Sequence, residues 1–470
     1  MRTKRRFTDR VPPCKATLVS RRVVVAAIAS LLAACEGETS YVGLTFEVLT
    51  PEGFEWSRVA SIAVDLDDGE EVVRAEAAVE DGAFELVIEP SDPQRLIIAR
   101  VTLRDPAGGD VAAGATPPFV PLEIGVSSLR VFVSPHGSMT PLPGILPEAR
   151  HGGAATSLLG QYALVVSGPG DGSEAALYDG LTHAFLTGLA MPSQPIVRPR
   201  LAEIAPGLVL VLGDDTRAQL YDAVLGNAWG DAWSETAELD AAHLGATPGA
   251  CVAALPEGGA LVVGGRGSDG TESGAVTLLG LDGGAQMRPP LAEGRDGCRL
   301  VAFGSAVLVL PAVPEAGPYP DDLPPLLYDV STGETAVLTG AGAETTAAAR
   351  LIDGSALLVH RDGGLYRLEP RASGDVTVGA SDYRRVGLLD SLRIAPDVLV
   401  VGSLGVLVVG GSDADGVALD GGQSFGVDVS PAGSLEDVPR RGSAIASLPD
   451  VGVLVFGGSD APNRVMLLRP

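Results

Sequence analysis

Three carboxylates lie close together near residue 415, at Asp413, Asp415 and Asp420. Oxygen ligands of this kind bind Ca²⁺, so the three aspartates are candidate metal ligands. A calcium loop places its ligands at alternating positions of the sequence, and the third ligand of that alternating pattern is missing here. Aspartate is also common in turns, where its side chain accepts hydrogen bonds from the backbone. The pattern therefore favours turn residues over a Ca²⁺ site, and we expect no resident cofactor.

Two cysteines occupy matching positions, because Cys251 and Cys298 each lie nine residues before the start of an apolar run. The other two cysteines of the chain, Cys14 and Cys35, belong to the N-terminal leader described below or adjoin it. An even number of cysteines in a secreted chain favours a disulfide. The alternative is a pair of buried thiols, since the bond requires Cα atoms within about 7 Å of each other.

Five arginines precede similar apolar runs by 11 to 13 residues, at Arg150, Arg198, Arg295, Arg393 and Arg441. The repeated spacing predicts equivalent places in a repeated fold. A ring of guanidinium groups could then select an anionic ligand, such as a sugar acid or the carboxylates of a partner. Arginines beside loops also hydrogen-bond to backbone carbonyls and nearby acids, and we expect this structural role. The ligand-binding ring is the alternative interpretation.

The apolar runs are the elements that would position these residues. Near-copies of the segment Ala260–Gly265 (ALVVGG) begin at Ala163, Val209, Ala260, Val307, Ala356, Val406 and Val453. Neighbouring starts are 46 to 51 residues apart, a period typical of propellers and arrays. A short run of leucine and β-branched residues ended by glycines is typical of a strand buried on both faces. Each unit is thus predicted to contribute a central strand, and the sheets to pack around an axis.

The strand after the apolar run often reads Leu-Tyr-Asp, at 177–179, 220–222 and 327–329. Together with the preceding arginine, a small-residue strand, the apolar strand and the glycine pair, this pattern resembles the kelch-type repeat. The resemblance covers residues 137–470 and implies a seven-bladed β-propeller. Some units depart from the pattern: the third and fifth lack the arginine, and the third, sixth and seventh lack Tyr-Asp.

The last unit ends one strand short of a four-stranded blade. Residues 137–143 have a pattern similar to that of residues 433–439, which lead into this last unit. We therefore expect the segment before the first unit to supply the missing strand and to close the ring without free sheet edges.

Residues 41–136 alternate between apolar and polar positions in short segments separated by Asp-Gly, Pro and Gly-Gly turns. The expected strands are Val42–Val48, Val59–Asp65, Val72–Val79, Phe84–Glu89, Leu96–Leu103, Phe119–Ile124 and Leu129–Val133. Seven short strands predict a small immunoglobulin-like or transthyretin-like β-sandwich. The expected fold is thus all-β, with this sandwich at 41–136 and a seven-bladed kelch-like propeller at 137–470.

The N-terminus has the charge and hydrophobicity of an export leader. Residues 1–22 are basic and polar, and Val23–Ala34 are twelve apolar or small residues. A membrane span needs about 20 apolar residues, whereas a segment of this length is typical of a signal peptide.

The leader ends in Leu32-Ala33-Ala34-Cys35, which resembles the lipobox of bacterial lipoproteins. The resemblance implies removal of residues 1–34, lipidation of Cys35, and a tether at 35–40 that joins the protein to a lipid bilayer. Glu36 in place of an aspartate implies the outer membrane, with the protein facing the periplasm or the cell surface. Ordinary secretory cleavage with a free Cys35 is the alternative.

The chain after the leader is strongly acidic. The whole sequence has a formal net charge of −26, and residues 1–34 contain both lysines and six of the arginines. An acidic surface repels phosphate backbones and anionic lipid headgroups, which argues against nucleic-acid binding. Because no lysine follows the leader, lysine Schiff-base chemistry is also excluded.

The sequence gives no set of residues with the spacing of a metal or catalytic centre. Its histidines are scattered over different units, at His136, His151, His183, His243 and His360. We therefore expect a non-catalytic binding or scaffolding module for a protein or glycan. The alternative is a carbohydrate-active or copper-radical oxidase-like propeller enzyme.

Overall fold

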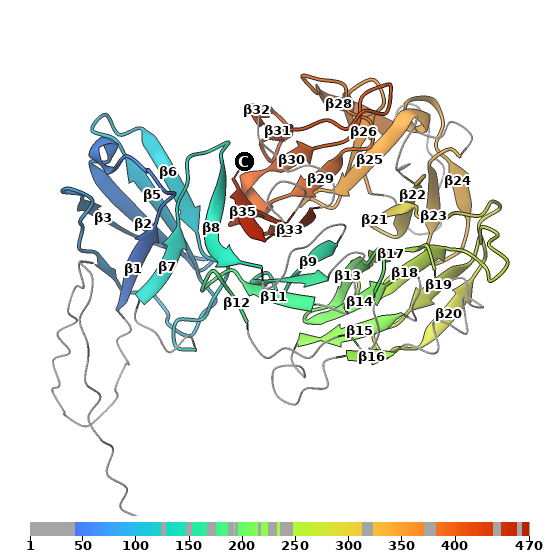
Figure 1. The fold of residues 1–470 in the computed structure, drawn as a ribbon, viewed down its shortest axis with the longest axis horizontal. Helices are drawn as coiled ribbons and strands as arrows, with labels where there is room; N and C mark the ends of the chain where they lie inside the picture. The colour runs from blue at the N-terminus through green and yellow to red at the C-terminus, as the bar shows by residue number, and fades with distance from the viewer. Residues whose placement is uncertain are drawn as a thin grey trace, which may run out of the picture.

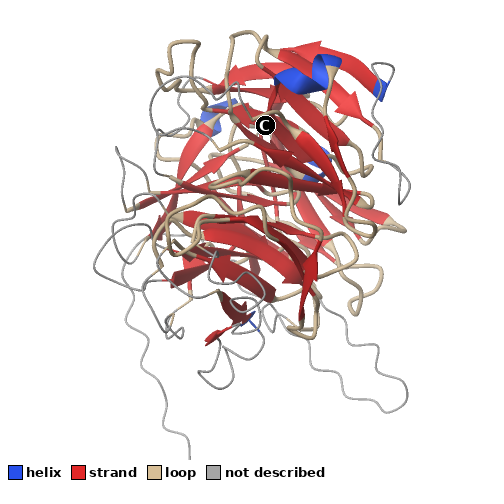
Figure 2. Cartoon of the chain, turned by 90° about the vertical axis from the view of Figure 1, so that its right-hand side faces the viewer, coloured by secondary structure: helices blue, strands red, loops and turns tan. Residues whose placement is uncertain are grey.

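The fold is all-β (Figures 1 and 2). The computed structural model describes residues 43–123, 128–146, 153–166, 175–186, 192, 196–214, 218–223, 233–235, 248–312, 323–370, 382–435, 443–457 and 463–469. Short 3-10 turns occur at Trp56–Arg58, Gly340–Glu344 and Gly402–Leu404. Of the helices within these residues, none is long and apolar enough to cross a membrane.

The N-terminal strands form two sheets that share one apolar core. Their orders are β4-β1-β7 and β3-β2-β5-β6, and β1 pairs with β7 in parallel. Alternate residues of β2, such as Ile62 and Val64, face Leu44 and Val131 of the other sheet in this core. The strands are β1 Leu44–Leu49, β2 Ser61–Asp67, β3 Val72–Ala78, β4 Val87–Ile88, β5 Ile98–Arg104, β6 Asp110–Ala115 and β7 Ser128–Phe132.

One predicted strand of this region is wrong. The described part of the expected strand Phe119–Ile124, residues 119–123, forms only an isolated bridge between Phe119 and Ile97, and the strand that pairs with β5 is Asp110–Ala115. Prolines at 117, 118 and 121 flank Phe119 and cannot donate to a ladder. The sequence of β6, DVAAGA, holds one β-branched residue and no aromatic one, so its composition does not indicate a strand.

The rest of the chain forms seven sheets of four antiparallel strands within the described residues. Along the chain, six of them are made of consecutive strands, and the seventh has the order β33-β34-β35-β8. The strands are β8 Met139–Ile145; β9 Ala154–Leu158, β10 Tyr162–Val166, β11 Ala175–Asp179, β12 Ala184–Phe185; β13 Arg200–Ala205, β14 Leu208–Leu212, β15 Gln219–Asp222, β16 Trp233–Glu235; β17 Ala250–Ala254, β18 Ala260–Gly264, β19 Val276–Leu279, β20 Ala285–Arg288; β21 Arg299–Phe303, β22 Ala306–Leu310, β23 Leu326–Asp329, β24 Thr335–Val337; β25 Thr345–Arg350, β26 Ala356–His360, β27 Gly364–Leu368, β28 Tyr383–Leu388; β29 Asp397–Val400, β30 Val406–Val409, β31 Gly422–Phe425, β32 Pro431–Leu435; β33 Ala444–Leu448, β34 Gly452–Phe456 and β35 Arg464–Leu468.

Every predicted apolar run is the second strand of its sheet, and each is buried on both faces. In β18, for example, all five residues are buried. Glycine ends this strand for a steric reason, because Gly264 has a φ of 76° and a Cβ there would lie 1.9 Å from the carbonyl oxygen of Arg295. The apolar run therefore specifies a buried strand, and its terminal glycine allows the next loop to pass close to the backbone.

Seven apolar clusters join each sheet to the next, and one of them joins the last sheet to the first. In that last cluster Phe456 of β34 lies against Tyr178 of β11, with ring centroids 5.8 Å apart. Figure 1 shows the first strands of the sheets (β9, β13, β17, β21, β25, β29 and β33) around a common centre. This arrangement is propeller-like.

Strand β8 precedes the first of these sheets in sequence but completes the last one. It pairs with β35, with Thr140 opposite Leu467 and Met139 opposite Leu468. The expected strand within residues 137–143 is therefore present, and Figure 1 shows it between the N-terminal sheets and the ring.

The N-terminal sheets contact the ring at its first and last sheets. Phe132 of β7 belongs to the apolar cluster between those two sheets, and its ring centroid lies 6.2 Å from that of His183. A guanidinium nitrogen of Arg100 lies 3.7 Å from a carboxylate oxygen of Asp450. This junction is thus built from apolar contacts with one half-exposed ion pair at its side.

Candidate functional site

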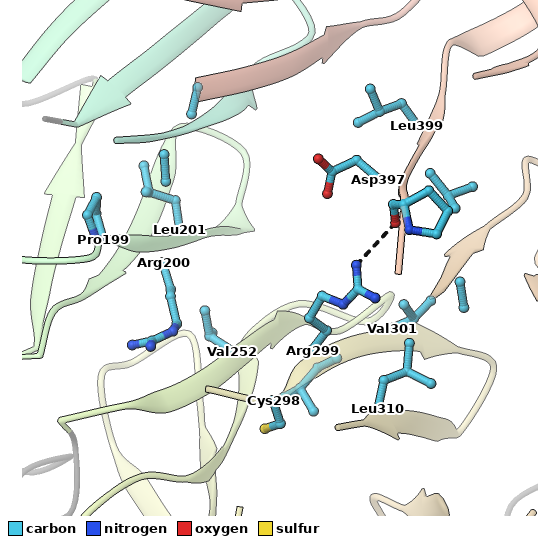
Figure 3. A pocket seen from close by; sticks show the side chains of 16 residues that line it. Pro199, Arg200, Leu201, Val252, Cys298, Arg299, Val301, Leu310, Asp397 and Leu399 are labelled. Atoms are coloured by element: carbon cyan, nitrogen blue, oxygen red, sulfur yellow. Dashed lines mark hydrogen bonds between the residues drawn. The ribbon is translucent and has the colours of Figure 1, made fainter. Parts of the chain in front are cut away.

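A cavity of about 490 Å³ lies at the centre of the ring (Figure 3). Its wall comes from the innermost strands of six sheets and is mostly apolar, with Leu201, Val301 and Leu399 among its residues. Short alanine side chains, such as Ala154 and Ala348, leave the centre unfilled. The volume is within the range of about 300–1,000 Å³ that is typical of ligand pockets.

Arg299 lies at the start of β21 and links this strand to the next two sheets along the chain. Its Nη1 atom donates to the carbonyl oxygen of Pro396 at 3.1 Å, and its Nη2 atom donates to that of Thr346. Its buried Nε atom has no hydrogen-bond partner within the described part of the chain. The guanidinium group is therefore held by the backbone of the wall, and its positive charge stays beside the cavity.

Asp397 is the first residue of β29, and its carboxylate points into the cavity (Figure 3). Water reaches this side chain, but the ring of protein encloses it. That enclosure raises the pKa of the carboxyl group, and the charge of Arg299 opposes the rise. No donor among the described residues hydrogen-bonds to its oxygens, so Asp397 presents an acceptor group to any occupant of the cavity.

Arg200 lines the opposite wall, with its guanidinium group directed away from Asp397 (Figure 3). Its Nη1 atom donates to Asp214 at 2.9 Å, and the same carboxylate accepts the backbone N–H of Gly249 at 3.2 Å. Arg198, one of the predicted arginines, is largely exposed and lies 3.5 Å from Asp214. Asp214 thus holds both arginines at the rim of the ring.

Two further predicted arginines are buried and donate to backbone carbonyls. Arg295 donates from Nη2 to the carbonyl oxygen of Pro324 at 3.0 Å. Arg393 donates to the carbonyl oxygens of Gly410, Gly421 and Asp420, at 2.8, 3.2 and 3.1 Å. Loops between strands place these carbonyls around the guanidinium groups, which is the structural role expected for these arginines. The ligand-binding ring stays an untested prediction. Arg150 and Arg441 lie outside the described residues.

The three candidate Ca²⁺ ligands do not converge. The Asp413 carboxylate accepts the backbone N–H groups of Asp415 and Val417, at 3.0 and 2.8 Å, and so closes its own turn. Asp420 contributes its backbone carbonyl to Arg393. No group of three or more His, Cys, Asp or Glu residues in the described part of the chain could hold a metal ion.

Comparisons with known proteins identify no family for this chain. No family model matches the sequence, and no curated protein matches it. Among solved structures, the chain is similar to a fungal alcohol oxidase of the AA5 family in complex with copper, at 12% identity and a TM-score of 0.45. That match covers 71% of this chain and 76% of the oxidase. The structure of YjhT is similar at 15% identity and a TM-score of 0.41, over 62% of this chain and 98% of YjhT.

The two cysteines are joined in the structure by a disulfide. Cys251 of β17 and Cys298, just before β21, have Cα atoms 5.6 Å apart. The bond connects neighbouring sheets, and Cys298 lines the central cavity beside Arg299. Cys35, the predicted lipidation site, lies outside the described residues.

The buried histidines are in separate sheets and make structural contacts. His183 Nδ1 lies 3.1 Å from the hydroxyl oxygen of Tyr178, and burial lowers the pKa of His183 to about 4. His360 stacks on Tyr366 with ring centroids 3.9 Å apart, and burial lowers its pKa also to about 4. Both imidazoles are thus neutral at pH 7.

One serine has the Gly-x-Ser-x-Gly spacing of a nucleophile, at residues 422–426, which was not among the expected site residues. Ser424 lies inside strand β31, and its hydroxyl group donates to the carbonyl oxygen of Gly433 at 3.2 Å. A nucleophile of this motif requires a sharp turn from strand to helix, which this segment does not form.

Sequence reasoning also missed Arg299 and Asp397, the two charged residues on the same side of the cavity. Each is the first residue of an innermost strand. The repeat period shows that these two positions are equivalent, but whether a side chain at such a position faces the axis depends on the assembled ring: Arg200, the first residue of β13, turns away to Asp214.

Proposed function

We propose that the seven four-stranded sheets are the blades of a kelch-type β-propeller closed by β8. The two sheets before it are an immunoglobulin-like or transthyretin-like sandwich. The repeat of 46 to 51 residues and the apolar clusters between successive sheets support this architecture.

The propeller acts as a non-catalytic binding module for a glycan or a protein, with the central cavity as its ligand site. The observation that carries this function is the cavity of about 490 Å³, which has an apolar wall and a carboxylate directed into it. Ligand pockets characteristically combine an apolar surface with a few polar groups that fix the orientation of the ligand.

The module is a lipid-anchored protein of the bacterial cell envelope. The Leu32–Cys35 segment supports an acyl anchor at Cys35, and Glu36 supports the outer membrane. Two or more acyl chains anchor a protein stably, because each buried methylene contributes about 0.8 kcal/mol.

A screen of small neutral, cationic and anionic molecules by saturation-transfer NMR tests the cavity as a binding site. Ala348→Leu fills part of the cavity, and Ala78→Leu makes the same change at an exposed position of β3. We expect some molecules to bind the wild type and Ala78→Leu but to lose their signal with Ala348→Leu. A screen in which no molecule distinguishes the two variants would contradict the proposed site.

A further inference from the structure

The three charged side chains of the cavity differ in their hydrogen bonds. Arg200 donates to Asp214, and Arg299 donates to two backbone carbonyls. The carboxylate of Asp397 has no hydrogen-bond donor among the described residues, and Arg299 acts on it only as a nearby charge. Asp397 is therefore the polar group of this wall that is available to a ligand.

The charge of the ligand follows from this arrangement. The carboxylate of Asp397 is accessible from the cavity and has no donor among the described residues, so a cationic N–H group can pair with it directly through a charge-assisted hydrogen bond. An anionic ligand would be repelled by Asp397, and the guanidinium group of Arg299 is turned toward the backbone carbonyls of Pro396 and Thr346, to which both terminal nitrogens donate. A neutral ligand would displace water from the carboxylate without replacing its charge stabilisation.

The net negative charge of the whole chain also favours a cationic ligand. The formal net charge is −26, and both lysines precede residue 35. A strongly negative protein raises the local concentration of cations near its clefts.

We propose that the central cavity binds a ligand that presents an alkylammonium group, with its nitrogen paired to Asp397 and its hydrocarbon part against Leu201, Val301 and Leu399. This inference rests on the proposed binding site and names the chemical class of its ligand. A single ammonium group on an apolar chain matches one carboxylate on an apolar wall.

Isothermal titration calorimetry with hexylammonium, hexanol and hexanoate tests the proposal at constant ionic strength. Asp397→Asn removes the cavity charge, and Asp415→Asn removes an equal charge from an exposed turn. We expect hexylammonium to bind the wild type and Asp415→Asn equally, and Asp397→Asn at least 10-fold more weakly. Hexylammonium should also bind the wild type more weakly as the pH falls, because protonation of Asp397 removes its charge.

Equal affinity of hexylammonium for the wild type and Asp397→Asn would overturn the proposal, as would tighter binding of hexanoate than of hexylammonium. The pH series on the wild type decides the question independently, should Asp397→Asn fail to fold. Hexanol separates the two inferences: if it binds the wild type and is excluded by Ala348→Leu, the cavity remains a ligand site even where the ammonium preference fails. Failure of all three probes to bind would overturn the alkylammonium proposal, and the screen with Ala348→Leu then decides separately whether the cavity is a ligand site.

Discussion

Backbone carbonyl oxygens are the main partners of the arginines near the centre of the ring. Arg393 gathers three carbonyls, and Arg299 connects two neighbouring sheets through two more. Loops between sheets carry carbonyls that no strand satisfies, and a guanidinium group with five donors suits them. This need explains the burial of Arg393 and Arg295, whereas the recurring Arg198 is largely exposed and pairs with Asp214.

His183 lies at the junction of the N-terminal sheets and the ring, and it makes the free energy of unfolding depend on pH. Its pKa is lowered to about 4 in the folded protein, from about 6.5 for a free histidine, so the unfolded chain binds more protons between these values. Stability is therefore fully present above pH 6.5 and is lost as the pH falls toward 4. The predicted loss is about 3 kcal/mol, by the relation of about 1.4 kcal/mol per pKa unit.

Urea unfolding at pH 4.5 and pH 7 measures this effect. His183 has a φ of 55°, which asparagine tolerates, so His183→Asn is the appropriate variant. The variant should lose less stability between the two pH values than the wild type, while His360 contributes equally to both. Identical losses in the two proteins would contradict the assignment to His183.

Some residues were predictable from the sequence and others were not. The pairing of Cys251 and Cys298 followed from their equivalent positions, because a repeat places equivalent residues side by side. Asp397 follows a proline at the start of a strand, and nothing in its neighbourhood marks it as facing a cavity. Its role depends on the axis formed by all the sheets together, which no local pattern encodes.

At the scale of elements, the central strands were the most predictable, since their composition leaves few alternatives. A run such as VLVL is buried wherever it lies, and glycine ends it. The outermost strands were not predictable, because they are short and exposed. Strand β20, for example, reads AQMR and contains no buried residue. Proline similarly removed the strand expected at Phe119–Ile124, which its apolar residues had favoured.

Strand β8 should stabilise the ring more than the N-terminal sheets do. A chain that starts at residue 137 retains β8, whereas one that starts at residue 147 loses it together with buried Leu142 and Leu146. At about 1.5–3 kcal/mol per buried leucine, the loss should approach 5 kcal/mol before lost backbone pairing is included. Thermal unfolding by circular dichroism compares the two chains. Equal melting temperatures would show that β8 does not contribute to closing the ring.

At the scale of the whole molecule, the proposed acyl anchor would determine where the proposed binding module acts. Cys35→Ser should move the protein from the membrane fraction to the soluble fraction and abolish palmitate labelling, because the thiol is the acylated group. Fractionation and metabolic labelling measure both outcomes. Membrane association that persists in Cys35→Ser would contradict the anchor, and Cys14→Ser is the matched control because the cleaved leader contains that cysteine.

The pairing of β8 with β35 also constrains how the molecule is made. Strand β8 ends at Ile145 and its partner β35 begins at Arg464. Strand β8 is therefore synthesised early but can pair only after β35 has been synthesised. A chain that stops before β35 leaves the backbone groups of β8 unpaired, and it exposes the apolar residues of the first sheet that pack against the last one. Pairing of β8 with β35 therefore acts as a check that synthesis has reached the last sheet.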